Sequence, residues 1–366
     1  MKILITGATG FVGGAIACEL GVRGLLDRAV FLVRASNAEE GLQRLIGNLQ
    51  KFQQKSSSIQ VIAGQIICAD LSAIDSVQTS TWAGVTHVIH CAALATFSNN
   101  PKIWAMNVDS TLALAKIVSK YGALERWLQV GTAMSCGPGL TSPVHESWGQ
   151  DVGITPHLVP YTQSKIAAEL ALKALPNFPL VVVRPSIVVG HSQLGCAPSP
   201  SIFWVFRMAF ALERFTCAID DRIDIIPVDW CASAIVTLAL KPRLTHDLYH
   251  ISAGNQSSNQ FFEIDAAHAH ALNVAPLGER YKQLQLSDLR TLVPLFEERL
   301  GRVNRILILR ALSLYGAFAQ LNYVFDNQRL MDEGVAPSPA FSSYIQCCIE
   351  SCQSVPIAEQ MAYDFK

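Results

Sequence analysis

The feature that most constrains this chain is a glycine-rich turn close to its start. The apolar segment 3–6 is typical of a β-strand, and it leads directly into TGATGFVG and then into the pattern of an amphipathic helix. Gly7 allows a tight turn, Gly10 lets backbone amides approach a pyrophosphate, and Gly13 permits close packing of helix on strand. The turn therefore predicts a dinucleotide site formed by Gly7, Thr9, Gly10, Phe11, Val12 and Gly13.

Short apolar runs alternate with helical patterns through the first half of the chain. These runs are rich in Val, Ile and Leu and lack a two-residue alternation, as expected of strands that helices cover on both faces. Such an order predicts an α/β fold with a doubly wound, parallel sheet of the Rossmann type. The expected strands cover residues 3–6, 29–33, 59–63, 87–91, 127–130 and 180–183.

The pattern loosens after Pro185. A segment rich in Gly, Pro and Ser at 190–200 precedes an aromatic, apolar helix pattern. We expect a nucleotide-binding core over residues 1–190, with later segments around 223–252 interleaved. Residues 191–366 would form mainly a smaller substrate-binding lobe and C-terminal helices.

The end of the second predicted strand bears on the choice of cofactor. Arg34 stands where an NAD enzyme usually presents Asp or Glu to the ribose 2′-hydroxyl. A guanidinium can pair with a 2′-phosphate and stack on adenine, and Ser36 is a possible second phosphate ligand. NADP(H) is therefore favoured over NAD, with a solvated surface arginine as the alternative.

Tyr161 and Lys165 lie one turn apart at the start of a predicted helix, so both can reach one bound molecule. A lysine ammonium beside a phenol lowers the phenol pKa, and it can also hold the nicotinamide ribose. The tyrosine would then donate or accept a proton near neutral pH. The segment 131–135 follows a predicted strand and offers hydroxyls that could hydrogen-bond a substrate carbonyl.

Charge and cysteine content exclude several classes of function. The chain has 28 basic and 29 acidic side chains and no long run of like charges, so we expect no nucleic-acid partner. Its ten cysteines form no CxxC pair, which favours reduced thiols in a cytosolic setting. The cluster Cys347, Cys348 and Cys352 lacks supporting histidines, so we expect no metal site.

Apolar residues make up 50% of the chain, and the longest candidate for membrane contact is 306–325. The segment contains Arg310, Gln320 and Asn322, which favours a buried or partner-facing helix, with peripheral membrane contact as the alternative. The first residues lack the pattern of a signal peptide. We therefore expect a cytoplasmic protein.

Together these motifs resemble the extended short-chain dehydrogenase/reductases, and more narrowly their thioester reductase and fatty acyl-CoA reductase branch. The resemblance covers about the first 250 residues. The glycine turn and YTQSK at 161–165 are typical of the superfamily. Its other markers are LVRA at 32–35, HCAA at 90–93, NVDST at 107–111, RPSIVVG at 184–190 and IIPVDWCASAI at 225–235.

The resemblance implies a catalytic centre in which Thr132 supplies a hydroxyl, Tyr161 acts as the acid and Lys165 supports it. The family often has Ser-Thr where this chain has Gly131-Thr132, so Ser135 is a possible substitute for Thr132. The adenine-binding motif is expected at Gln65 and Ile66, unless the register shifts it to Asp70-Leu71. Further cofactor contacts are implied at Ala92, Ala93, Asn107, Pro185, Ser186 and Ile187.

We therefore expect an NADPH-dependent reductase of an acyl thioester, giving an aldehyde or, with a second hydride, an alcohol. The thioester would be an acyl-CoA or would be delivered by an acyl carrier protein, and the oligomeric state stays open. One alternative is a dehydrogenase, reductase or epimerase acting on a ketone, aldehyde, sterol-like alcohol or nucleotide sugar. Another is a non-catalytic NADP-binding sensor.

Overall fold

The fold is seen in a computed structural model, which describes residues 1–52, 60–148, 156–200, 202–301 and 303–364. Its centre is a seven-stranded sheet with the order β11-β6-β5-β4-β1-β2-β3, in which every pairing is parallel. This confirms the predicted Rossmann-type sheet. The strands are β1 (Ile3–Thr6), β2 (Ala29–Val33), β3 (Ile66–Cys68), β4 (His87–His90), β5 (Arg126–Val130), β6 (Leu180–Pro185) and β11 (Leu248–Ile251).

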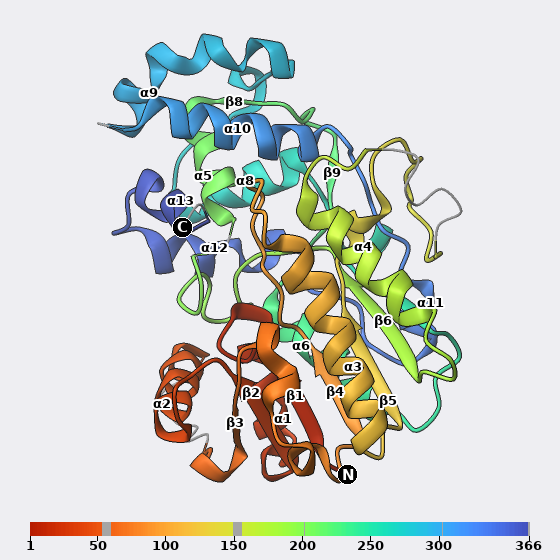
Figure 1. Cartoon of the computed structure of the whole chain (residues 1–366). Helices are drawn as coiled ribbons and strands as arrows, with labels where there is room; N and C mark the ends of the chain where they lie inside the picture. The colour runs from red at the N-terminus through yellow and green to blue at the C-terminus, as the bar shows by residue number, and fades with distance from the viewer. Residues whose placement is uncertain (53–59, 149–155, 201, 302, 365–366) are drawn as a thin grey trace.

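Helices cover both faces of this sheet. Alternate residues of β1 point to opposite sides, with Ile3 and Ile5 in one core and Leu4 in the other. The first face carries α1 (Phe11–Val22), α2 (Ala38–Leu49) and α6 (Val228–Leu240), and the second carries α3 (Ser110–Tyr121) and α4 (Pro160–Lys173). Figure 1 shows α3 and α4 in front of the strands. Both faces are thus buried, which explains the continuous apolar runs of the strands.

A second core, rich in aromatic side chains, lies beyond the carboxyl ends of the strands. Phe203, Trp204, Phe261, Phe296 and Phe341 are fully buried in it. In Figure 1, α9 and α10 form the outer edge of this lobe. Its main helices are α5 (Phe203–Leu212), α8 (Phe261–Leu272), α9 (Val293–Leu300), α10 (Arg305–Ala319), α12 (Phe341–Cys352) and α13 (Ile357–Asp364).

Short strand pairs connect the segments of this lobe with one another. The pairs are β7 (Ile187–Val188) with β10 (Ile225–Ile226), β9 (Arg222–Ile223) with β12 (Asn259–Gln260), and β8 (Arg214–Phe215) with β13 (Lys282–Gln283).

The apolar segment 306–325 is divided between a helix and an extended return. α10 has 15 residues and buries Ile308, Ala311 and Leu312 in the second core. The chain then comes back to the sheet, where Tyr323 and Phe325 pack against the loop that follows β5. Within the described parts of the chain, no helix combines the length and apolarity needed to cross a membrane.

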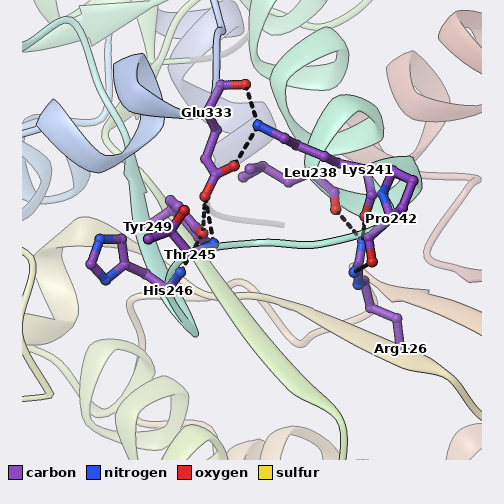
Figure 2. A network of polar contacts seen from close by, with 8 residues as sticks. All are labelled: Arg126, Leu238, Lys241, Pro242, Thr245, His246, Tyr249 and Glu333. Carbon is purple, nitrogen blue, oxygen red and sulfur yellow. Dashed lines mark hydrogen bonds and ion pairs between the residues drawn. The ribbon is translucent and has the colours of Figure 1, made fainter.

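The segment that follows α11 (Gln328–Asp332) is held on the sheet by the buried carboxylate of Glu333, which Figure 2 shows. Glu333 accepts hydrogen bonds from the Tyr249 hydroxyl at 2.7 Å and the Thr245 amide at 2.8 Å, and it pairs with Lys241 Nζ at 2.6 Å. Burial alone would raise the pKa of this carboxyl, but these bonds lower the pKa to about 2. Glu333 therefore remains charged and joins the segment after α11 to β11 and α6.

Candidate active site

The glycine turn between β1 and α1 packs closely against neighbouring backbone and lines an open space at the start of the helix. Gly7 has a φ of +75°, and a Cβ there would lie 2.8 Å from the Ala92 amide nitrogen. A Cβ on Gly13 would lie 2.3 Å from the Gly7 carbonyl oxygen. Since α1 begins directly after Gly10, its free amides face the same space. The turn thus fits the pyrophosphate of a dinucleotide.

This turn forms one wall of a cavity of about 550 Å³, here called the nucleotide cavity. It opens at the carboxyl ends of β1, β2, β4, β5 and β6, where open α/β sheets bind their ligands. Most of the residues expected at the site line it: Gly7, Thr9, Gly10, Phe11, Val12, Gly13, Arg34, Ala92, Ala93, Thr132, Tyr161, Lys165, Pro185 and Ser186.

Four expected cofactor contacts do not line the nucleotide cavity: Gln65, Ile66, Asn107 and Ile187. Ile187 lines the neighbouring cavity described below. Asn107 is buried behind the wall, where its amide accepts a hydrogen bond from Leu94 N at 2.7 Å and donates one to Ser164 Oγ at 2.9 Å. Asn107 therefore orients the loop after β4 against α4. It does not line the nucleotide cavity.

Gln65 and Ile66, the expected adenine contact, do not line the nucleotide cavity. The third strand is Ile66–Cys68, not the expected 59–63, of which residue 59 lies outside the described residues. Gln65 thus precedes the strand, and its amide donates to the Leu26 and Ala29 carbonyls at the amino end of β2. The residues that follow the strand and line the nucleotide cavity are Ala69, Asp70 and Leu71.

Arg34 and Arg44 form a basic corner at this end of the nucleotide cavity. The Arg34 side chain is 72% exposed, and its Nη1 lies 3.9 Å from Asp70 Oδ2. Arg44, from α2, donates to the Arg34 carbonyl. Ser36, the expected second phosphate ligand, donates through both its amide and its hydroxyl to Glu40. Arg44 is therefore better placed than Ser36 to assist Arg34.

Helix α4 places Tyr161 and Lys165 at the inner end of the nucleotide cavity, as the spacing predicted. Pro160 begins the helix, and its fixed φ suits the first turn. Lys165 is 3% exposed and donates from Nζ to the Val130 carbonyl at 2.6 Å. Each side chain thus faces the carboxyl end of β5, where the chain continues to Thr132.

In this structure the pKa of the Tyr161 phenol lies above its ordinary value, although the neighbouring lysine was expected to bring it down. Burial, reinforced by the negative charge of Glu169, raises the pKa of Tyr161 to about 12. The uncharged phenol is therefore the form present near neutral pH. A protonated phenol suits a reductase, which has to donate a proton or a hydrogen bond to the carbonyl oxygen.

Thr132 and Ser135, the two candidate hydroxyls, point in different directions. Thr132 is half-buried and lines the cavity. Ser135 is 1% exposed and donates from Oγ to the Thr132 carbonyl at 2.7 Å, away from the cavity. The geometry therefore favours Thr132 over Ser135.

A second cavity of about 230 Å³, here called the substrate cavity, meets the nucleotide cavity at Thr132, Tyr161, Ser186 and Val188. Its walls come from segments far apart in the sequence, and apolar side chains dominate them. Two of the segments, 202–212 and 306–325, are apolar stretches that the sequence suggested for a fatty acyl chain, whereas Phe97 was not expected at the site. The walls include Phe97 from the loop after β4, Ile202, Val205, Phe206 and Ala209 on or beside α5, and Tyr315, Phe318 and Ala319 on α10.

The charged residues of the substrate cavity are already paired within the protein. Asp224 is buried and accepts backbone hydrogen bonds from Ala253 and Phe325. Arg222 donates to the Ser258 carbonyl, and Asp221 accepts from Asn322. These pairings leave a predominantly apolar space beside Tyr161.

Two cysteines of the cluster near the C-terminus belong to the second core. Cys348 and Cys352 are buried in the second core, and Cys352 Sγ lies 2.6 Å from the Cys348 carbonyl oxygen. Within the described residues, no group of three or more His, Cys, Asp or Glu side chains is arranged to hold a metal ion.

Comparison with known proteins agrees with this arrangement. Residues 5–235 match the male sterility protein family. The chain is 28% identical over 273 residues to aldehyde reductase lnbA of Aspergillus flavus, a match that covers 70% of this chain and 27% of that protein. It is also 28% identical over 292 residues to peramine synthetase ppzA of Metarhizium majus, covering 74% and 10%. The chain thus spans about a quarter or less of these relatives.

Solved structures share the fold. The terminal R domain from the myxalamid PKS-NRPS pathway superposes with a TM-score of 0.70 at 20% identity, covering 96% of this chain and 90% of that one. The reductase domain of a non-ribosomal peptide synthetase from Mycobacterium tuberculosis gives 0.66 at 18% identity, covering 97% and 92%. With the family match over more than half of its length, the chain belongs to the male sterility protein family of NAD(P)-dependent reductases, within the extended short-chain dehydrogenase/reductases.

Proposed function

We propose that this chain is an NADPH-dependent reductase of acyl thioesters with an apolar acyl group, and that Thr132, Tyr161 and Lys165 are its catalytic residues. One observation carries the proposal: an apolar cavity and a nucleotide cavity meet at Thr132 and Tyr161. A thioester carbonyl at this junction would have its acyl chain in the substrate cavity. Similar proteins include an aldehyde reductase and reductase domains of peptide synthetases.

NADPH, when bound in the nucleotide cavity, supplies the hydride for the carbonyl carbon. As negative charge develops on the carbonyl oxygen, the Tyr161 phenol and the Thr132 hydroxyl stabilise it by hydrogen bonds. Tyr161 then donates its proton, and the tetrahedral adduct loses the thiol to give the aldehyde. The Lys165 ammonium favours this proton transfer because a positive charge stabilises the phenolate that forms.

The choice of NADPH over NADH rests on Arg34 and Arg44. Both line the nucleotide cavity beyond the end of β2, where the ribose 2′-position would lie. Two guanidinium groups suit a 2′-phosphate, which carries charge and several acceptor oxygens. Asp70 and Leu71 would contact the adenine.

A nucleotide sugar fits the substrate cavity less well, because its diphosphate would need unpaired cations. Three arginines in this part of the chain all have protein partners: Arg207 donates to Gln360, Arg214 to the Leu212 carbonyl and Arg222 to the Ser258 carbonyl. A second candidate function is reduction of a free aldehyde, which the name of the similar Aspergillus protein supports. A thiolation-reductase di-domain of similar fold makes a carrier-bound thioester a reasonable form of the substrate.

The test is NADPH oxidation with a series of acyl-CoAs and with the corresponding aldehydes. Turnover of thioesters that improves with the apolar length of the acyl group is the expected result. Turnover of aldehydes alone would replace the proposal by the second candidate. Binding of NADPH without turnover of either class would favour the non-catalytic sensor.

Ala209 is expected to set the length of the acyl group that the substrate cavity accepts. It lies on the cavity face of α5 and is smaller than its neighbours Val205 and Phe206. An Ala209→Phe substitution should fill the space that two or three methylene groups would occupy. Each buried methylene contributes about 0.8 kcal/mol of binding free energy. The substitution should therefore cost about 2 kcal/mol, or roughly thirtyfold in kcat/KM for the longest substrates.

For short acyl-CoAs, the Ala209→Phe variant should have nearly the same kcat/KM as the parent. Ala317→Phe is the matched control, since Ala317 is half-buried on α10 but does not line the substrate cavity. Equal losses for all chain lengths would show that Ala209 does not limit length.

A further inference from the structure

A buried ion pair lies beside the catalytic residues, and the mechanism above does not use it. Glu169 follows Lys165 by four residues on α4, so the two side chains share one face of the helix. The Glu169 side chain is fully buried, and its Oε2 accepts hydrogen bonds from Arg184 Nε at 3.0 Å and Nη2 at 2.8 Å. Arg184, on β6, is 3% exposed. Burying such a pair costs free energy, because both charged groups lose their hydration.

The second oxygen of Glu169 lies against the strand that leads to Thr132. Glu169 Oε1 is buried and has no hydrogen-bond partner among the described residues. A Cβ at position 131 would lie 2.1 Å from this oxygen, so only glycine leaves room for it. Gly131 in turn donates its amide to the Val183 carbonyl at 2.7 Å. The carboxylate therefore lies between the ends of β5 and β6.

Lys165 and Glu169 contact successive residues of the same strand end. Lys165 Nζ donates to the Val130 carbonyl, and Glu169 Oε1 fills the space beside Gly131. The next residue is Thr132. One face of α4 thus supports the part of β5 that presents the catalytic hydroxyl.

The groups around Lys165 leave Glu169 as its negative neighbour. His90 at the end of β4, Cys91 directly after it and Glu169 on α4 interact with its charge, and Arg184 on β6 lies beyond Glu169. Tyr161, one turn earlier on α4, lines the same cavity as Lys165. Burial, with a smaller effect of Lys165, lowers the pKa of His90 to about 3, so this imidazole is neutral. Burial also raises the pKa of Cys91 to about 12 despite the opposing charge of Lys165, so the thiol is neutral too.

We propose that Glu169 is a positioning residue for the catalytic centre: its carboxylate, held by Arg184, keeps Lys165 charged on the Val130 carbonyl and supports the strand end that carries Thr132. Burial lowers the pKa of Lys165, and the charge of Glu169 opposes this effect. Without that charge, Lys165 would lose its proton at a lower pH. The catalytic part of this inference rests on the function proposed above.

The test is Glu169→Gln, which keeps the shape of the side chain and removes its charge. The alkaline fall of kcat/KM for thioester reduction should move to lower pH by about one unit or more, because a neighbouring opposite charge typically shifts a pKa by about 1–3 units. Glu169→Asp keeps the charge and should restore most of the parent profile. An unchanged profile in Glu169→Gln would overturn the proposal.

Glu333→Gln is the matched control. Glu333 is also a buried carboxylate that accepts several hydrogen bonds, but it lies in the network of Figure 2 and lines neither cavity. Its substitution should lower the Tm without moving the pH profile. If both variants moved the profile equally, the effect would be one of general stability and not of Glu169.

A measurement without substrate separates this inference from the proposed function. The ¹³Cε resonance of Lys165, assigned by its loss in Lys165→Arg, reports the charge of the ammonium directly. Its titration should lie at lower pH in Glu169→Gln than in the parent and should not move in Glu333→Gln. Equal titration in parent and Glu169→Gln overturns the inference, even if thioesters are reduced.

If the parent reduces no thioester, the proposed function fails while this titration still decides the effect of Glu169 on Lys165. If Glu169→Gln does not fold, the double variant Glu169→Gln/Arg184→Gln leaves no unpaired buried charge and should fold. A downward shift of the Lys165 titration is expected in it too, smaller because the positive charge of Arg184 is also removed, and its absence would count against the proposal.

Discussion

Replacing Tyr161 by Phe is expected to lower kcat/KM for thioester reduction by about 100- to 10,000-fold, the usual range for removal of a positioned general acid. The substitution keeps the ring, which lies 6.0 Å from the ring of Phe97, and removes only the hydroxyl. Thr132 can still donate one hydrogen bond to the developing oxyanion. It cannot replace the proton that the phenol supplies, because an aliphatic hydroxyl is a far weaker acid.

NADPH affinity should change little in Tyr161→Phe, which fluorescence titration of the bound nucleotide would check. Tyr121→Phe is a suitable control, because Tyr121 is 40% exposed at the end of α3 and lines neither cavity. A Tyr161→Phe enzyme with more than about a tenth of the parent activity would contradict the assigned role.

The double substitution Arg34→Ala/Arg44→Ala is expected to remove most of the preference for NADPH over NADH. A hydrogen bond to a charged group is worth about 1.5–3 kcal/mol, and solvent screening at these exposed side chains reduces that contribution. Together the two losses should amount to about 2–3 kcal/mol, or roughly 30- to 150-fold in the ratio of kcat/KM for NADPH to that for NADH. Activity with NADH should stay nearly constant, because NADH lacks the 2′-phosphate.

Arg310→Ala is the control for this change in charge, since Arg310 is exposed on α10 and does not line the nucleotide cavity. The ratio of kcat/KM for NADPH to that for NADH is measured at a saturating concentration of the thioester and at two salt concentrations. Salt screens the charges of the arginines and the 2′-phosphate, so it should weaken the parent's preference for NADPH. An unchanged ratio in the double variant would mean that these two arginines do not recognise the phosphate. Where the ratio does fall in the double variant, the two single variants show whether Arg44 contributes on its own.

Much of the fold was accessible from the sequence because its signals are local. The runs that became β1, β2, β4, β5 and β6 are short and continuously apolar, and each is followed by a turn or a helical pattern. The exception is β3, a strand of three residues with no fully buried side chain. It has a weak pattern, and the strand expected at 59–63 put Gln65 after a strand, whereas Gln65 precedes the strand in the structure.

The candidate site divides in the same way. The glycine turn and the pair Tyr161 and Lys165 are fixed by spacing within one turn or one helix, so their place beside each other follows from the chain itself. The substrate cavity cannot be predicted from local spacing in the sequence. Phe97, Ala209 and Tyr315 come from separate segments that meet only when the second core forms. No local pattern distinguishes these side chains from ordinary core residues.

The sequence by itself thus determined the parallel sheet, the dinucleotide turn and the place of Tyr161 and Lys165 on one face of a helix. Tertiary structure alone decided which residues follow β3 into the nucleotide cavity, how the substrate cavity is closed and how the catalytic groups ionise. The raised pKa of Tyr161 and the pairing of Glu169 with Arg184 across Gly131 depend on burial and on strands far apart in the chain. Desolvation and long-range contact are properties of the packed molecule, and no short sequence window contains them.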